Sequence, residues 1–161
     1  MQETIKNFMR SGKVFLVLYG PPGTYKTTTL KKLALYELKN RAPAPNPFYV
    51  YYTKFARLAK HLLEDQELHE IVLKTRLLLI DDLTFLSLRE AFWLELFDIL
   101  DERYEKKRKT IIATNHDPAE YLTGQVSMFT RIASRLCDEN LSTLYETQKS
   151  GSFRNRGGTE W

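Results

Sequence analysis

The chain has 161 residues, of which 43% are apolar and 27% charged, and this is the size and composition of one globular domain with its own core. Its formal net charge of +4 is compatible with nucleic-acid binding but does not require it. A single cysteine, Cys137, excludes an internal disulfide and indicates a reducing compartment. No apolar run is long enough to span a bilayer or to act as a signal peptide, so we expect a cytoplasmic protein.

Patterns typical of strands and of helices alternate along the chain. We expect helices at residues 2–10, 27–40, 54–63, 89–107 and 128–137, and strands at residues 13–20, 48–53, 76–83, 109–116 and 142–148. This alternation predicts one α/β domain with a parallel five-stranded sheet flanked by helices. We expect the domain to span residues 1–154, and residues 155–161 to form a flexible tail. Ligands of such sheets bind at the carboxyl ends of the strands.

The segment GPPGTYKTT, residues 20–28, follows the first strand and nearly fits the phosphate-loop pattern G-x-x-x-x-G-K-[ST]. The residues predicted to hold a nucleotide are Gly20, Pro21, Pro22, Gly23, Thr24, Tyr25, Lys26, Thr27 and Thr28. In such a loop Lys26 reaches the β and γ phosphates of ATP, and Thr27 places its hydroxyl on Mg²⁺. A glycine–proline turn that happens to precede Lys-Thr is the alternative. The strand before the loop, the helix after it and a later acidic pair favour the nucleotide site.

Tyr25 stands where the pattern has its second glycine. If the loop needs a positive φ there, a bulky residue costs on the order of 1–2 kcal/mol. If φ is negative, the Cβ atom points outward at little cost. The backbone N–H, which binds the phosphate, survives in either case. The sequence therefore predicts a working but weakened loop, with the Tyr25 ring on its outer surface.

Polar residues end two later strands. The strand LLLIDDL places Asp81 beside the bound Mg²⁺, where it acts through a metal-bound water, and Asp82 where it polarises the attacking water. A helix cap after a strand is the alternative role for these carboxylates. The strand TIIATNH ends at Asn115, which is positioned to orient the water. The catalytic residues expected within one chain are therefore Lys26, Asp82 and Asn115, with Thr27 and Asp81 at the metal.

With these residues in place the sequence resembles the AAA+ ATPases, and more narrowly the DnaC/DnaI helicase loaders and the IstB transposition ATPases. The resemblance runs from about residue 10 to 154, through GPPGT-x-KT, LLLIDDL and LFDILDERYEKKRKTIIATN. RIASRLCD is similar to the arginine-bearing SRL element of that group, and SGSFR to its C-terminal ending. The phosphate loop and acidic strand are shared by many ATPases, whereas the E-R-Y-E segment with SRL is more specific.

The resemblance implies an AAA+ core without a C-terminal lid domain, assembled into a ring or spiral with ATP at subunit interfaces. It makes Asn115 the sensor 1 residue and Arg135 an arginine finger that acts on the ATP of a neighbouring subunit. Arg131, one helical turn before Arg135, is a candidate assistant, and Arg154 a weaker candidate for a phosphate contact. A solvated basic helix face is the alternative for both helical arginines.

Related loaders grip single-stranded DNA. Here Lys54, Arg57 and Lys60 recur every three residues on a predicted helix, next to Phe55. Cations that track phosphates, with an aromatic ring that stacks on bases, make a single-strand surface. A solvated basic stripe with Phe55 in the core is the equal alternative. The cluster EKKRK, residues 105–109, is a weaker second candidate, because a helix C-terminus favours cations in any case.

The interpretation that accounts for all these features is an ATP-binding and ATP-hydrolysing helicase loader. We expect it to act on single-stranded DNA in replication, with a replicative helicase as its partner. An IstB-type ATPase that remodels double-stranded DNA for transposition is the first alternative. A small-molecule kinase and a scaffold that binds nucleotide without hydrolysis are the others. The kinase would need an arginine-rich lid that the sequence lacks, and only Tyr25 supports the scaffold.

Overall fold

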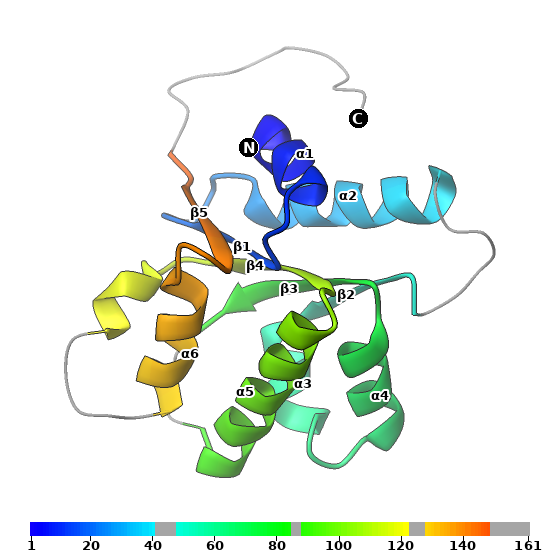
Figure 1. The fold of residues 1–161 in the computed structure, drawn as a ribbon, viewed down its shortest axis with the longest axis vertical. Helices are drawn as coiled ribbons and strands as arrows, with labels where there is room; N and C mark the ends of the chain where they lie inside the picture. Colours follow the sequence, from blue (N-terminus) through cyan, green and yellow to red (C-terminus); the bar gives the residue numbers. More distant parts are fainter. Residues whose placement is uncertain (41–47, 85–87, 123–127, 149–161) are drawn as a thin grey trace.

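The computed structural model describes residues 1–40, 48–84, 88–122 and 128–148. The helices are α1 (Gln2–Arg10), α2 (Lys26–Asn40), α3 (Phe55–His61), α4 (Gln66–Lys74), α5 (Glu90–Glu105) and α6 (Met128–Cys137), with a 3-10 helix at Pro118–Tyr121. The strands are β1 (Phe15–Tyr19), β2 (Val50–Lys54), β3 (Leu77–Leu83), β4 (Lys109–Thr114) and β5 (Ser142–Glu146). Figure 1 shows the sheet running between the helices.

The strands form one parallel sheet in the order β2-β3-β4-β1-β5, which confirms the predicted five-stranded sheet. β1 therefore lies between β4 and β5, and the loop that follows β1 emerges near the middle of the sheet. The loops after β3 and β4 leave the same edge, because all the strands point the same way. This topology brings segments distant in the sequence to one edge of the sheet.

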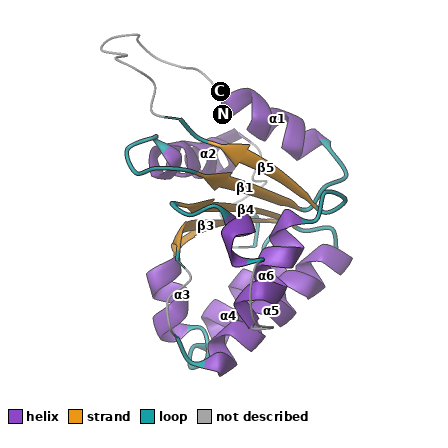
Figure 2. Ribbon diagram, turned by 90° about the vertical axis from the view of Figure 1, so that its left-hand side faces the viewer, coloured by secondary structure: helices purple, strands orange, loops and turns teal. Residues whose placement is uncertain are grey.

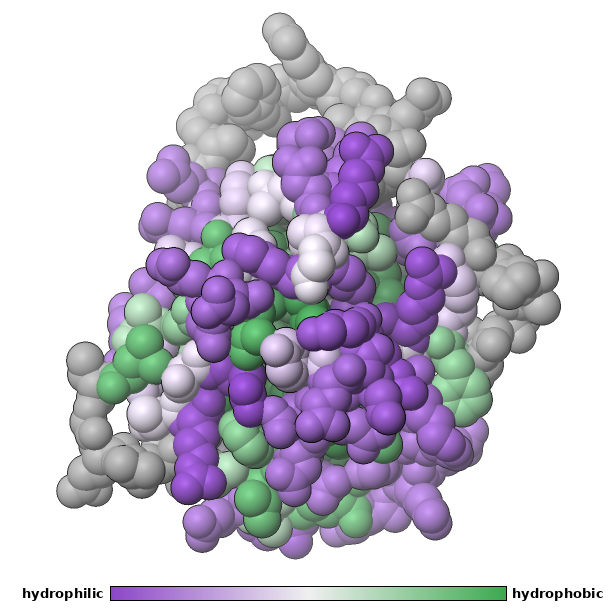
Figure 3. Space-filling view, in the orientation of Figure 1, coloured by the Kyte–Doolittle hydropathy of each residue, from purple (hydrophilic) through white to green (hydrophobic). Residues whose placement is uncertain are grey.

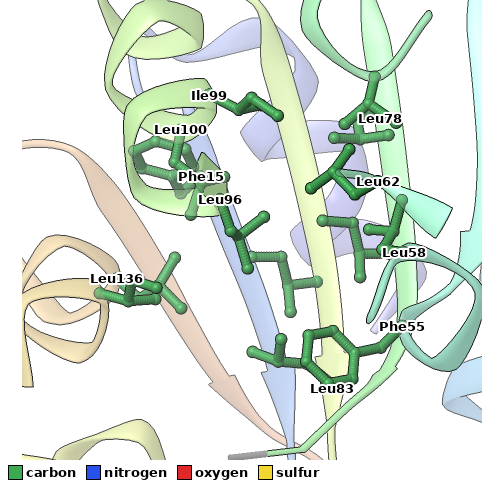
Figure 4. Close-up of a cluster of buried hydrophobic side chains, with 14 of the residues drawn as sticks. Phe15, Phe55, Leu58, Leu62, Leu78, Leu83, Leu96, Ile99, Leu100 and Leu136 are labelled. Carbon is green, nitrogen blue, oxygen red and sulfur yellow. The ribbon is translucent and has the colours of Figure 1, made fainter. Parts of the chain in front are cut away.

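Helices cover both faces of the sheet: α1 and α2 lie on one side, and α3 to α6 on the other (Figure 2). Successive strand residues point to opposite faces, so Leu16 and Leu18 pack in a core with α1 and α2. Phe15 and Val17 pack in the larger core beneath α3 to α6, part of which is drawn in Figure 4. Strands buried on both faces explain the continuous apolar runs in the sequence. Polar side chains cover most of the described surface in Figure 3.

Two elements were not predicted: α4 and the 3-10 helix at Pro118–Tyr121. Asp65 caps α4, because its carboxylate accepts a hydrogen bond of 2.9 Å from the backbone N–H of Leu68. Asp117 caps the 3-10 helix in the same way, with a bond from the N–H of Ala119. Residues 41–47 and the predicted tail, residues 155–161, lie outside the described residues.

The E-R-Y-E segment has a structural role because it contains the buried residue Arg103. Its side chain is fully buried, and its Nε and Nη groups donate hydrogen bonds to Thr110 Oγ1 and to the carbonyls of Val72, Thr75 and Lys109, at 2.6 to 2.9 Å. Burial, and next the nearby Arg108, lower the pKa of Arg103 to about 9, so it is charged at neutral pH. One guanidinium thus ties the end of α4 and the start of β4 to α5.

No lid domain follows the sheet among the described residues, which end two residues beyond β5. Within the described part of the chain, every helix is too short or too polar to cross a membrane.

Candidate nucleotide-binding site

A cavity of about 540 Å³ opens at the carboxyl edge of the sheet, where the loops after β1, β3 and β4 meet. Its walls are formed by Pro22, Gly23, Thr24, Tyr25, Lys26, Thr27, Thr28, Lys54, Asp81, Asp82, Ala113, Thr114 and Asn115. The structure therefore brings together the predicted phosphate loop, the acidic pair and the asparagine. Gly20 and Pro21 belong to the loop but do not line the cavity.

The loop needs positive φ at three positions: Gly20 (131°), Gly23 (82°) and Tyr25 (64°). Tyr25 therefore occupies the left-handed region, which costs a non-glycine residue about 1–2 kcal/mol. Its side chain is 66% exposed, so the ring lies outward as the sequence predicted. Unusual backbone geometry of this kind concentrates at functional sites.

Lys26 begins α2, and its ammonium group folds over the loop. Nζ donates hydrogen bonds to the carbonyls of Gly20 (2.7 Å) and Pro21 (2.9 Å) and to Thr24 Oγ1 (3.1 Å). The residue is only 7% exposed. Burial lowers the pKa of Lys26, while Asp81 and Asp82 act in the opposite direction. The side chain of Lys26 is thus held against the loop where it lines the cavity.

Asp81 lies at the end of β3 and is buried, with each of its two oxygens in a hydrogen bond. Thr27 Oγ1 donates to Oδ1 at 3.0 Å, and the Tyr52 hydroxyl donates to Oδ2 at 2.7 Å. Burial, then this hydrogen bond to Asp81, raise the pKa of Tyr52 well above its usual range. The hydroxyl and carboxylate predicted to meet a metal are therefore already neighbours. Tyr52 was not predicted as a site residue.

Asp82 and Asn115 face each other across the exposed part of the site. Asn115 Nδ2 donates to Asp82 Oδ1 at 3.3 Å. Asp82 has a φ of 61°, and the register between β3 and β4 shifts between Ile80 and Leu83. This irregularity turns consecutive carboxylates to different environments, because Asp81 is buried whereas Asp82 is exposed.

Thr147, just beyond β5, is a further contact that the sequence did not reveal. It is 2% exposed, and its Oγ1 lies 2.7 Å from Thr24 Oγ1 in hydrogen-bond range. Thr147 also donates from its backbone N–H and its hydroxyl to the carbonyl of Tyr19, at 2.6 and 2.9 Å. A Cβ atom on Gly20 would lie 2.4 Å from the Thr147 carbonyl oxygen. The end of β5 therefore supports the phosphate loop and requires glycine at position 20.

The residues predicted to bind nucleic acid separate in the structure. Lys54, Arg57 and Lys60 are exposed, but Lys54 also lines the nucleotide cavity. Phe55 is 2% exposed and stacks on Trp93 at a centroid distance of 5.6 Å. The prediction that Phe55 stacks on bases is therefore wrong, since its ring is part of the core. The alternating burial of α3 places Phe55 inward and the cations outward.

Arg135 lies on α6, outside the cavity of its own chain. It pairs with Asp101 of α5, and its guanidinium lies 5.6 Å from the ring centroid of Phe97. A second cavity of about 450 Å³, between α5 and α6, is lined by Arg135 and Arg131 among others. Arg154 lies outside the described residues. Arg135 therefore does not line the nucleotide cavity of its own chain.

Known proteins share this architecture. The chromosomal replication initiator DnaA of Herpetosiphon aurantiacus is 29% identical over 147 residues, which are 89% of this chain and 31% of that protein. The structure of AMPPCP-bound DnaA from Aquifex aeolicus has a TM-score of 0.72 and 25% identity, and covers 92% of this chain and 45% of that one. A DnaA bound to AMPPCP and single-stranded DNA has the same identity and coverage, with a TM-score of 0.69.

The DnaC helicase loader shares the fold, with a TM-score of 0.65 and 21% identity over 91% of this chain and 87% of that one. The chain spans about a third of the Herpetosiphon protein and under half of the DnaA structures. Residues 4–138 match the family described as the bacterial DnaA ATPase domain. Because this match covers most of the chain, and the fold and the cavity agree with it, the protein belongs to that family of AAA+ replication ATPases.

Proposed function

We propose that the chain binds and hydrolyses ATP in the cavity at the carboxyl edge of the sheet. The observation that carries this proposal is the convergence of Lys26, Thr27, Asp81, Asp82 and Asn115 on that one cavity. Backbone N–H groups of the loop and the N-terminus of α2 favour the phosphates of the nucleotide. Lys26 is expected to contact the β and γ phosphates.

The residues at the metal position fit a magnesium ion. Thr27 Oγ1 and Asp81 Oδ1 lie 3.0 Å apart, and both are hard oxygen ligands of the kind that Mg²⁺ takes. When bound, Mg²⁺ supplies positive charge that offsets the charge developing on the phosphates. Asp81 would hold the ion through a bound water, and Thr27 would contribute its hydroxyl.

Asp82 and Asn115 are positioned for the attacking water. Both side chains are exposed at the cavity and lie 3.3 Å apart, so a water between them and the γ phosphate can bond to both. Asp82 polarises this water and Asn115 orients it. Arg135 lies outside the cavity of its own subunit, so it is proposed to act on the ATP of a neighbour in a ring or spiral.

We further propose that the protein serves DNA replication as a loader-type factor on single-stranded DNA, with a replicative helicase as its partner. The family match to replication initiators favours replication over IstB-type transposition. The DnaA structure bound to single-stranded DNA supports DNA as a ligand of this fold at 25% identity. In this chain the exposed Lys54, Arg57 and Lys60 are the candidate phosphate contacts.

The test is phosphate release from ATP, measured with and without a single-stranded oligonucleotide. We expect release that requires Mg²⁺ and is stimulated by DNA, and its loss in Asp82→Asn and Arg135→Ala. Lys39 is exposed in the last turn of α2, far from the loop. Lys39→Ala is therefore the matched charge control and should leave phosphate release unchanged. Tight nucleotide binding without release would instead support the non-hydrolysing scaffold.

A further inference from the structure

The carboxylate of Asp81 is fixed from two sides. Thr27 reaches Oδ1 from the phosphate loop, at 3.0 Å, and Tyr52 reaches Oδ2 from β2, at 2.7 Å. Asp81 is 2% exposed, so water does not provide an easy substitute for either hydroxyl. The two oxygens therefore have distinct partners, and only the Oδ1 side faces the threonine of the loop.

Tyr52 occupies a position from which it holds Asp81 without touching the ligand. It lies on β2, where Tyr52 pairs in register with Leu79 and Lys54 pairs with Asp81. Its ring packs against the core under α1 and α2, and the ammonium of Lys31 lies 5.9 Å from the ring centroid. Tyr52 is not among the residues that line the nucleotide cavity. Any effect of Tyr52 on the site must therefore pass through Asp81.

We propose that Tyr52 is a positioning residue for the magnesium site. Its hydroxyl occupies Oδ2 and thereby keeps Oδ1 on the side of Thr27, where the metal binds. This inference rests on the proposed function of the cavity and extends it to a residue outside the phosphate loop and the acidic pair. Partners that orient a metal-binding carboxylate commonly affect metal affinity by about 10- to 100-fold.

Loss of the hydroxyl has a specific consequence. In Tyr52→Phe the ring and its packing remain, but Oδ2 loses the donor that the structure provides. The buried carboxylate can then rotate so that either oxygen faces Thr27. Its interactions with Thr27 and with a bound metal are weakened. The phosphate loop itself is untouched. Nucleotide binding without metal should therefore be unchanged, whereas its enhancement by Mg²⁺ should need more metal.

The experiment is a Mg²⁺ titration of the binding of a fluorescent ATP analogue, with an EDTA baseline. In Tyr52→Phe we expect the Mg²⁺ concentration for half-maximal enhancement to rise about tenfold, with an unchanged affinity in EDTA. Tyr51→Phe is the matched control, because it makes the same change at the preceding residue of β2. The side chain of Tyr51 packs on the other face of the sheet. It should titrate like the unmodified protein.

A double variant separates an effect through Asp81 from a general loss of structure. If Tyr52 acts through Asp81, adding Tyr52→Phe to Asp81→Asn should not change the Mg²⁺ response further. A Tyr52→Phe titration within twofold of the control, in protein of unchanged melting temperature, would overturn the inference. If Tyr52→Phe fails to fold, Tyr52→4-aminophenylalanine, which keeps a donor at the same place on the ring, must give the Mg²⁺ response of the unmodified protein, or the inference is wrong. Nucleotide binding by the unmodified protein that ignores Mg²⁺ would refute the proposed function instead.

Discussion

At the scale of single residues, Tyr25 is the main departure from the phosphate-loop pattern. Its φ of 64° shows that the loop keeps the glycine-like conformation although the residue has a Cβ atom. The ring is 66% exposed, so little packing depends on it. The backbone conformation, rather than the ring, is therefore what the substitution strains.

This leads to a prediction for two variants of Tyr25. Both Tyr25→Gly and Tyr25→Ala remove the ring, but only alanine keeps a Cβ atom at positive φ. We expect the free energy of unfolding to be about 1 kcal/mol higher for the glycine variant than for the alanine variant. Urea denaturation measures the difference. Equal stability of the two variants would show that the loop relaxes around the Cβ atom.

At the scale of secondary-structure elements, Arg103 joins α4, α5 and β4 through one buried cation. Its acceptors among the described residues are backbone carbonyls and a hydroxyl rather than carboxylates. A buried arginine of this kind is costly to remove, because its acceptors lose their donors together. It therefore supports β4, the strand that presents Asn115.

We predict that Arg103→Met lowers the free energy of unfolding by about 3 kcal/mol or more, since several buried carbonyls lose their donors. Arg57→Met is the matched control at an exposed position, and should change it by less than about 0.5 kcal/mol. Both values come from urea denaturation. A loss below 1 kcal/mol in Arg103→Met would mean that water or neighbouring groups take over the guanidinium's role.

At the scale of the whole molecule, each chain carries both parts of the proposed catalytic machinery, but in separate places. The cavity carries Lys26, Asp82 and Asn115, whereas Arg135 lies on α6 and pairs with Asp101. Under the proposed function, one subunit would offer its cavity and another its arginine. Within one chain, Arg135 of α6 is held by its ion pair with Asp101 of α5.

Mixing two inactive variants tests this arrangement. Lys26→Ala is expected to lose its own nucleotide site but to keep a usable Arg135, and Arg135→Ala the reverse. Together with DNA, the mixture should regain a substantial part of the phosphate release that each variant lacks alone. The Lys26→Ala and Asp82→Asn variants, mixed in the same way, are the control and should stay inactive. A mixture of the first pair that stays inactive would contradict an arginine offered in trans.

Much of this molecule follows from local sequence patterns. The apolar runs at residues 13–20, 76–83 and 109–116 predict β1, β3 and β4, because turns flank them and both faces are buried. The phosphate loop and the acidic pair could also be predicted from local sequence, because their chemistry depends on residues that are neighbours in the chain. The sequence of α4 also carries a local pattern, with Asp65 as a cap before apolar residues at helical spacing.

Only the tertiary structure decided which distant side chains meet. Phe55 was consistent with a base-stacking surface until its contact with Trp93 placed it in the core. Tyr52 contacts Asp81, and Thr147 contacts Thr24. The sequence around Tyr52 and around Thr147 does not indicate these partners. The sequence by itself determined the elements and the kinds of chemical groups at their ends. The contacts between those groups depend on strand order and packing, which arise only when the whole chain folds.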